Sequence, residues 1–367
     1  MFSPEKPLAL KPGDTVEVLS KEEILATLDE NGTLDRLPFM PEMLQFCGQR
    51  FTVYKRANKA CDTIDKTGGR RLYQTVHLGG QNYPDDLRCD GAAHGGCQAS
   101  CLIFWKEAWL KRVDNQNEPI RGNTNGLSKT MLNGCTEANL LQSAVVGSSG
   151  KDSGAIFRCQ ATQLKEYTEP LAWWDFRQYI RDITSGNVRV GQMIRSLVFS
   201  AYRKLVETGR GYRLKISLYD WYQSRTGGGP FPYGQGTLSK TPKGELHLQP
   251  GEWVRVKSFN DILATLNEGN RNQGLWFDAE MARFCGGTYR VLKRVHRIID
   301  EKNGRMLEFH NPCIILQNVY CRAEISKYRL FCTRSIYPYW REIWLERTNP
   351  QQTPVVGSPY ANRNPSH

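Results

Sequence analysis

The sequence has no apolar run long enough to cross a membrane, and its opening residues, MFSPEKPLAL, contain no apolar signal core. We therefore expect a cytoplasmic protein with no membrane partner. It also lacks a GxxxxGK[ST] phosphate loop, a dinucleotide-binding glycine fingerprint and an ordered Ser-His-Asp set. The sequence thus gives no support to the common nucleotide-binding and hydrolase chemistries, and whether the protein is an enzyme stays open.

Histidine is scarce, with six residues, but cysteine is abundant, with eleven among 367. In the cytoplasm such cysteines are more often free thiols or metal ligands than disulfides. Lys and Arg outnumber Asp and Glu by 49 to 37, which gives a formal net charge of +12. This excess favours an anionic partner, with nucleic acid as one candidate, although solubility alone is an equal explanation.

A long internal repeat organises the chain: residues 11–62 align with residues 249–300 without a gap. The identical positions include ILATL at 24–28 and 262–266, Phe-Cys-Gly at 46–48 and 284–286, and Lys-Arg at 55–56 and 293–294. A match of this length indicates a duplicated module.

Each copy has alternating valines, a serine at an expected helix N-cap, a short apolar helix face and a glycine-rich hairpin. We predict an α+β fold, mainly β, with two tandem SH3-like small barrels that carry short helical insertions and are joined by a helical insert. The predicted segments are a first SH3-like module at 9–113, a loop or lid at 114–154, a helical insert at 155–225, a Gly/Pro linker at 226–247, a second SH3-like module at 248–348 and a disordered tail at 349–367.

Both copies end in a similar aromatic segment, WKEAWLKR at 105–112 and WREIWLER at 340–347. The spacing predicts a helix with two tryptophans on one face. Packing of these tryptophans in the core is favoured over stacking on a ligand, because aromatic stripes usually belong to the core.

Four potential metal ligands lie close together in the string CDGAAHGGCQASC: Cys89, His94, Cys97 and Cys101. Cys97 and Cys101 are one helical turn apart, so at the start of a helix both sulfurs would face one point. The glycine pair after His94 allows a tight turn of the backbone. Three thiolates and an imidazole form a complete tetrahedral set, so this spacing predicts a metal site.

Zinc is the metal that this ligand set favours, and an iron–sulfur cluster is the alternative. The string Cys-Asp-Gly-Ala-Ala-His resembles the Cys-Asp-Gly-x-His loop of the CDGSH iron–sulfur proteins, which also use three Cys and one His. Here one extra residue separates Cys89 from His94, and the upstream Cys-x-Cys of that family is missing.

The corresponding stretch of the second copy has no histidine, and Ile336 stands where the first copy has Cys101. Its candidates for an altered second metal site are Cys313, Cys321 and Cys332. Cysteines that only pack are the alternative. In the first copy, Cys61 is a candidate extra ligand or reactive thiol, because its hairpin is expected near Cys89.

A basic hairpin occurs in each copy. The candidates for anion binding are Lys55, Arg56, Lys293 and Arg294. These residues would suit an anionic polymer, and a solvated strand face is the plainer interpretation.

The segments GDTVEVLSKEEILATLD, LPFMPEMLQFCG, HGGCQASCLIFWKEAWLKR and IYPYWREIWLER resemble a family of uncharacterised bacterial proteins over nearly the whole chain. That family is associated with gene neighbourhoods for polysaccharide or specialised-metabolite synthesis. The resemblance implies a bacterial accessory protein of a biosynthetic pathway and brings no reaction with it.

Three hypotheses follow. The first is a metal-binding accessory or binding protein, with structural zinc in the first module and an unknown protein or an anionic ligand as partner. The second is a metal- or iron–sulfur-dependent biosynthetic enzyme, and the third is a nucleic-acid-binding protein.

Overall fold

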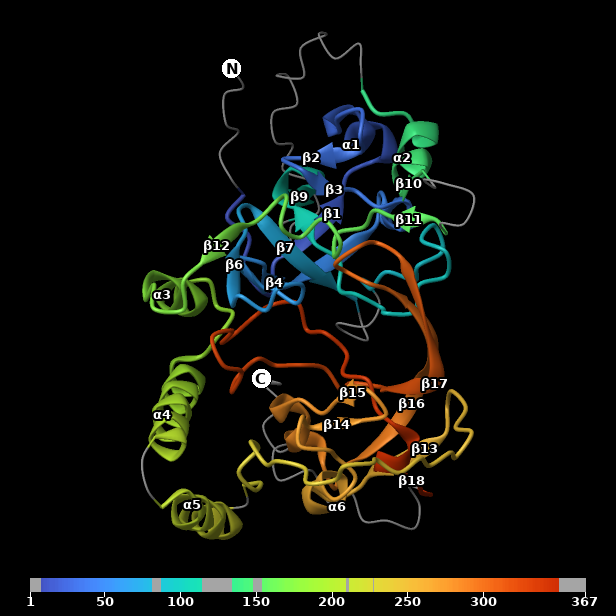
Figure 1. Ribbon diagram of the computed structural model, residues 1–367. Helices are drawn as coiled ribbons and strands as arrows, with labels where there is room; N and C mark the ends of the chain where they lie inside the picture. The colour runs from blue at the N-terminus through green and yellow to red at the C-terminus, as the bar shows by residue number, and fades with distance from the viewer. Residues whose placement is uncertain are drawn as a thin grey trace. The chain divides into compact units, whose positions relative to one another are not determined.

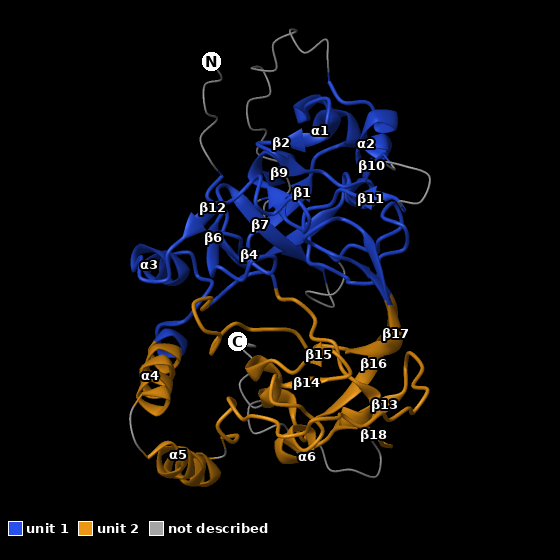
Figure 2. Cartoon of the chain, in the orientation of Figure 1, with its two compact units in different colours: residues 1–193, 297–308, 331–334 blue, residues 194–296, 309–330, 335–367 orange. Residues whose placement is uncertain are grey.

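The computed structural model describes residues 8–80, 87–113, 134–147, 154–208, 211–226 and 228–349 (Figure 1). The fold is mixed α+β, and most of its sheets are small and antiparallel. The chain divides into two compact units (Figure 2), of which the first comprises residues 1–193, 297–308 and 331–334, and the second residues 194–296, 309–330 and 335–367. The division passes through a hairpin of the second module, so the end of that hairpin belongs to the first unit.

A five-stranded sheet, in the order β8-β7-β4-β1-β9, forms the centre of the first module. The elements of this module are β1 (Thr15–Val18), α1 (Lys21–Thr27), β2 (Thr33–Leu34), β3 (Leu37–Pro38), η1 (Pro41–Phe46), β4 (Arg50–Arg56), β5 (Lys59–Cys61), β6 (Gly69–Arg71), β7 (Thr75–Gly79), β8 (Trp105–Lys106), η3 (Glu107–Trp109) and β9 (Leu110–Arg112).

The second module has a four-stranded sheet in the order β17-β16-β13-β18. Its elements are β13 (Trp253–Val256), α6 (Phe259–Leu263), β14 (Arg271–Asn272), β15 (Leu275–Trp276), η5 (Ala279–Phe284), β16 (Thr288–Ile299), β17 (Met306–Leu316), η6 (Glu342–Trp344) and β18 (Leu345–Arg347).

Four strands of the first sheet, in the order β7-β4-β1-β9, correspond to the order β17-β16-β13-β18 of the second, and the aligned strands have the same register. Thr15 lies opposite Thr52 in the first module, and at the aligned positions of the second Trp253 lies opposite Arg290. Beyond the gap-free repeat, the hydrogen bond from the Cys89 N–H to the Cys101 carbonyl has its counterpart between Cys321 and Ile336. Duplicated residues therefore occupy duplicated places, and the modules can be compared position by position.

Local signals in the repeat place the first helices. Ser20 caps α1, because its hydroxyl accepts a hydrogen bond from the Glu23 N–H and the Glu23 carboxylate accepts one from the Ser20 N–H. Ser258 caps α6 in the same way through the Asp261 N–H. These predicted caps are confirmed.

The predicted helices over the aromatic segments are wrong. Residues 105–112 form β8, the short 3-10 turn η3 and β9, and the second copy has the same turn followed by β18. All four tryptophans are fully buried, which agrees with the core packing predicted for them: Trp105, Trp109, Trp340 and Trp344. Their spacing places them in the core from two short strands and a turn, an arrangement that periodicity alone does not separate from a helix.

Between the two modules in the sequence, the described residues form four helices and three short strands. They are α2 (Glu137–Ser143), β10 (Val145–Val146), β11 (Ile156–Phe157), β12 (Glu169–Leu171), α3 (Arg177–Thr184), α4 (Val190–Glu207) and α5 (Tyr212–Thr226). Of the predicted loop or lid at 114–154, residues 114–133 and 148–153 lie outside the described residues, as do residues 350–367 of the predicted tail.

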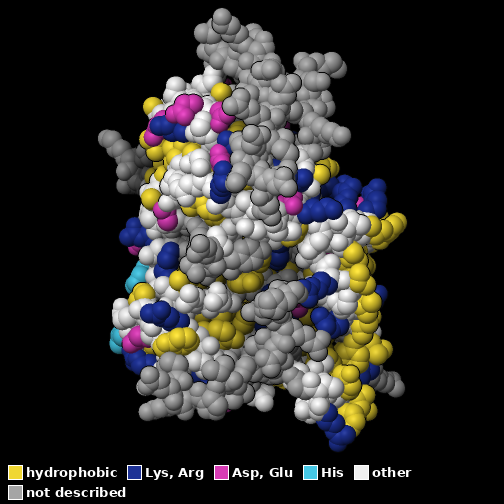
Figure 3. All heavy atoms as spheres, turned by 180° about the vertical axis from the view of Figure 1, so that it is seen from behind, with side chains coloured by type: hydrophobic (Ala, Val, Ile, Leu, Met, Phe, Trp, Pro, Cys, Tyr) yellow, Lys and Arg dark blue, Asp and Glu magenta, His cyan; other side chains and the backbone are white. Residues whose placement is uncertain are grey.

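The predicted helical insert at 155–225 contains α3, α4 and α5, and the burial along α4 does not follow residue polarity. Arg203 is buried, whereas Leu197 is 44% exposed. Hydrophobic side chains gather over α4 and α5 along one edge of the view from behind (Figure 3). In the described part of the chain, no helix combines the length and apolar character needed to cross a membrane.

Candidate metal centre

Glu42, Cys89 and His94 form a group that could hold a metal ion, because one ligand atom from each lies within 4.8 Å of the others. Glu42 comes from η1, which begins at Pro41, and the other two residues come from the loop that follows residue 86. Cys89 is fixed at the start of that loop by its backbone bond to Cys101. The group therefore joins two segments that are distant in sequence.

The backbone of the loop is shaped by tight turns that aim His94 at Glu42. The His94 N–H bonds to the Gly91 carbonyl, and the Ala92 N–H bonds to the Asp90 carboxylate. Gly91 has a φ of 78°, and a Cβ at this position would lie 2.1 Å from the Cys97 carbonyl oxygen. Only glycine fits this turn without displacing the segment that carries Cys97.

Hydrogen bonds hold the Glu42 and His94 side chains in one orientation. The Glu42 Oε1 atom lies 2.6 Å from His94 Nδ1 and accepts a bond from the Ala93 N–H at 3.1 Å. On the other side of the ring, His94 Nε2 lies 3.0 Å from the Arg158 carbonyl oxygen. A carbonyl behind the ring fixes its tautomer and direction, as it does for many metal-ligating histidines.

Burial and the Glu42–His94 contact set the charges of the group. Burial opposes ionisation of both residues, but the bond and charge of each partner outweigh it, so the pKa of Glu42 is lowered and the pKa of His94 is raised. Burial, followed by the charge of Glu42, raises the pKa of Cys89 well above its ordinary value. These shifts favour the charged forms of Glu42 and His94 and the neutral thiol of Cys89.

One atom of the group has no protein partner. The Glu42 Oε2 atom is buried and accepts no hydrogen bond from the described residues. A buried carboxylate oxygen without a donor is costly, and a cation can satisfy it. This orphaned oxygen, the neighbouring thiol and the imidazole fit the donor chemistry of a metal site.

The structure places the other two predicted ligands differently. Cys97 Sγ accepts a hydrogen bond from the Ile299 N–H at 3.3 Å, and the Cys101 carbonyl bonds to Cys89. Burial raises the pKa of the Cys101 thiol to about 12. The predicted helical turn between Cys97 and Cys101 is wrong, because the segment is irregular and Ser100 has a φ of 51°. Coordination by these two thiols stays a prediction.

The remaining cysteine candidates occupy separate places. Cys61 is buried on β5, and its carbonyl accepts a hydrogen bond from Arg334. Cys313 and Cys321 belong to the second unit, and Cys332 belongs to the first. Within the described ranges, none of these four residues joins a group of three ligands at metal-binding distance. Burial raises the pKa of the Cys313 thiol to about 11.

Arg56 and Arg294, two of the anion-binding candidates, form ion pairs with buried glutamates. Arg56 pairs with Glu107, which also accepts bonds from two backbone N–H groups. Arg294 and Glu342 repeat this arrangement in the second module. Lys55 lies over the ring of Tyr54 at 4.9 Å from its centroid. Anion binding by the hairpins stays a prediction.

Sequence reasoning missed Glu42 and the Arg158 carbonyl. A signal for Glu42 was present, because the repeat keeps a glutamate at this position, with Glu280 in the second copy. No sequence signal indicates a backbone carbonyl. Comparison with protein-family profiles and with curated proteins found no match for this chain.

Proposed function

We propose that the chain is a metal-binding accessory protein and that zinc, bound by Glu42, Cys89 and His94, stabilises its first module. The observation that carries the proposal is the buried Glu42 Oε2 atom, which accepts no hydrogen bond from any described residue and belongs to the same group as a thiol and an imidazole. Thiolate, imidazole and carboxylate are the three ligand types that zinc takes in proteins. The ion would replace the proton shared by Glu42 and His94, so its binding would release protons.

The donor set favours zinc over an iron–sulfur cluster. Clusters are held mainly by cysteine thiolates, and the group at Glu42 contains one sulfur, that of Cys89. A harder oxygen donor and an imidazole beside a single thiolate suit a borderline ion such as zinc.

Burial supports a structural role for the metal over a catalytic one. A catalytic zinc keeps a position that substrate can reach, even where three protein ligands hold it. The side chains of Glu42 and His94 are each 1% exposed. An ion held between them would fasten the loop after residue 86 to η1.

The finer architecture and the biological role belong to the same proposal. We take each module as an SH3-like barrel and the protein as cytoplasmic. From its resemblance to uncharacterised bacterial proteins, we infer an accessory role in biosynthesis of a polysaccharide or a specialised metabolite, through binding of a partner.

His94→Ser is the most informative variant, because the aligned position in the second module is Ser326, whose hydroxyl and backbone N–H both bond to Glu280. A serine at position 94 can thus keep the loop attached to Glu42 while it removes the imidazole. We expect the full-length protein to contain about one zinc per chain by elemental analysis, and the variant to contain less than a tenth of that amount.

Thermal unfolding of the same samples tests the structural role. If the ion is structural, His94→Ser and chelation of the wild type should lower the same unfolding transition, and chelation should not affect the variant further. Cys321→Ser is the matched control in the second module and should change neither zinc content nor the effect of chelator. Zinc-free wild-type protein would contradict metal binding, and loss of zinc without a thermal shift would contradict the structural role.

A further inference from the structure

The second module contains a buried arginine, Arg341, that forms no ion pair with a carboxylate of the described residues. Arg341 donates hydrogen bonds to the carbonyl oxygens of Asn272, Gln273 and Asn311, and NH1 lies 3.6 Å from Cys313 Sγ. The residue is 9% exposed, so water screens its charge poorly. Carbonyl dipoles orient the guanidinium group, but none of these partners carries a negative charge.

In the first module, the corresponding cation does have a carboxylate partner. Lys106 stands at the position of Arg341, and its Nζ atom bonds to the Tyr73 carbonyl at 3.5 Å and pairs with Asp35 at 2.9 Å. Tyr73 aligns with Asn311 across the two sheets, so Lys106 and Arg341 donate to backbone carbonyls at equivalent positions.

The residue that differs is the acid. Asp35 aligns with Gln273, and both have the same left-handed backbone, with φ of 49° and 47°. The Gln273 side chain turns away and donates to the Thr241 carbonyl. The second module thus keeps the buried cation and lacks the carboxylate that neutralises it.

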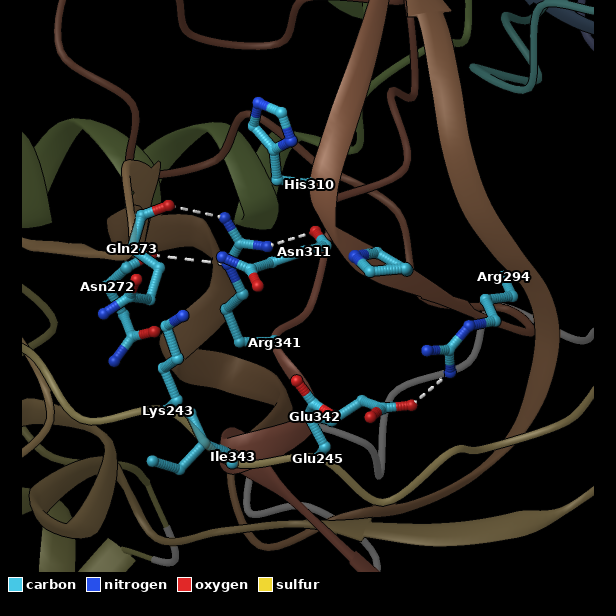
Figure 4. Close-up of a pocket in the computed structure, with 12 residues that line it drawn as sticks. Lys243, Glu245, Asn272, Gln273, Arg294, His310, Asn311, Arg341, Glu342 and Ile343 are labelled. Atoms are coloured by element: carbon cyan, nitrogen blue, oxygen red, sulfur yellow. Dashed lines mark hydrogen bonds and ion pairs between the residues drawn. The ribbon is translucent and has the colours of Figure 1, made fainter.

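A pocket of about 250 Å³ lies against this guanidinium. Two more cations, Lys243 and Arg294, line it together with His310 (Figure 4). Of the two carboxylates in its lining, Glu342 is occupied by Arg294 and three backbone N–H groups, and Glu245 is exposed. Lys243 is also exposed, on the Gly/Pro-rich segment before β13.

We propose that this pocket binds the oxyanion group, carboxylate or phosphate, of a small molecule. The planar guanidinium fork matches such a group, and a buried cation that lacks a fixed counter-charge gains most from a ligand that supplies one. Lys243 lies where it can add a second contact, and the volume suits a small metabolite rather than a polymer. The site lies wholly in the second unit and does not depend on the metal centre.

Titration calorimetry of the full-length protein, with inorganic phosphate and malonate as probes in chloride buffer, tests the proposal. We expect one saturable site per chain for at least one probe. Gln273→Asp restores the carboxylate found in the first module and should weaken binding at least about tenfold, because an internal acid then competes for Arg341. Lys243→Ala changes an exposed side chain, so the fold is kept, and should weaken binding several-fold.

The matched control is Asp35→Asn, which removes the acid of the first module and should leave binding unchanged. Binding of phosphate alone or of malonate alone supports the site and identifies its chemistry. No saturable binding of either probe would overturn the proposal, as would equal binding by wild type, Gln273→Asp and Lys243→Ala. Metal content remains at its wild-type value in all these variants if only the pocket is affected.

Discussion

Glu42 and Glu280 occupy the same place in the two modules, and each is buried with an Oε2 atom that accepts no hydrogen bond from the described residues, although Glu280 Oε2 lies 3.9 Å from Arg283 NH1. Each also anchors the same loop through Oε1, which accepts from Ala93 in the first module and from Ile325 and Ser326 in the second. The duplicated fold therefore requires a buried carboxylate as an anchor.

The two modules differ in the side chain that contacts this glutamate. His94 gives Glu42 a basic partner and lowers the carboxyl pKa, whereas burial dominates at Glu280 and raises its pKa. The Ser326 hydroxyl donates to Glu280 instead, so the second module has Glu280, Cys321 and Ser326 at the positions of Glu42, Cys89 and His94. One histidine thus turns an anchoring carboxylate into a candidate metal ligand.

The largest difference that we expect in stability lies at the start of the duplicated hairpin. Lys59 is 3% exposed and pairs with the buried Asp182, whereas its aligned residue Arg297 is exposed. Lys59→Ala leaves the acid buried without a cation and should lower the free energy of unfolding by about 3–5 kcal/mol. Arg297→Ala should change it by less than about 0.5 kcal/mol.

Urea denaturation of both variants measures this difference. A loss below about 1 kcal/mol for Lys59→Ala would mean that solvent reaches the pair. The double variant with Asp182→Ala should recover part of the lost stability, since it removes the unpaired charge.

A smaller difference between the modules should appear in how the free energy of unfolding depends on pH. His77 is fully buried where the second module has Ile315, and burial, followed by repulsion from Lys55 and Arg88, lowers its pKa to about 3. Between about pH 6.5 and pH 3, the histidine is protonated in the unfolded chain but stays neutral in the folded chain. The free energy of unfolding therefore falls as the pH drops through this range, by at most about 1.4 kcal/mol per pH unit. His77→Ile should reduce this slope of unfolding free energy against pH; an unchanged slope would contradict it.

The smallest difference between the modules is expected where both keep the same indole hydrogen bond. The Trp109 indole N–H donates to the Thr27 hydroxyl, and the Trp344 indole N–H donates to Thr265. Thr27→Val and Thr265→Val each leave a buried indole unsatisfied and should cost about 1–3 kcal/mol. Costs from denaturant titration that differ by more than about twofold would show that the duplicated cores are not equivalent.

Much of the local structure could be predicted because both copies of the repeat contain the same sequence signals. Alternating valines, the caps Ser20 and Ser258, and the glycine hairpins act over a few residues, and these elements formed as expected. The tryptophan segments misled the prediction, since buried aromatics spaced like a helix also fit two short strands around a turn.

The site could be predicted only in part. Cys89 and His94 are close in sequence, and the structure brings them together. Glu42 lies far along the chain, so its approach depends on how η1 packs against the loop, which spacing cannot show. The role of Arg341 could not be predicted from the sequence either. The first module has an acid, Asp35, where the second has Gln273, and this difference can be related to Arg341 only when the register of both sheets is known.

X-ray absorption at the edge of the bound metal tests the central claim most directly, because it counts sulfur ligands. Coordination by Glu42, Cys89 and His94 predicts one sulfur, with nitrogen and oxygen as the other ligands, and loss of the sulfur contribution in Cys89→Ser. Three sulfurs per metal would contradict this account and would assign the site to Cys89, Cys97 and Cys101 with His94.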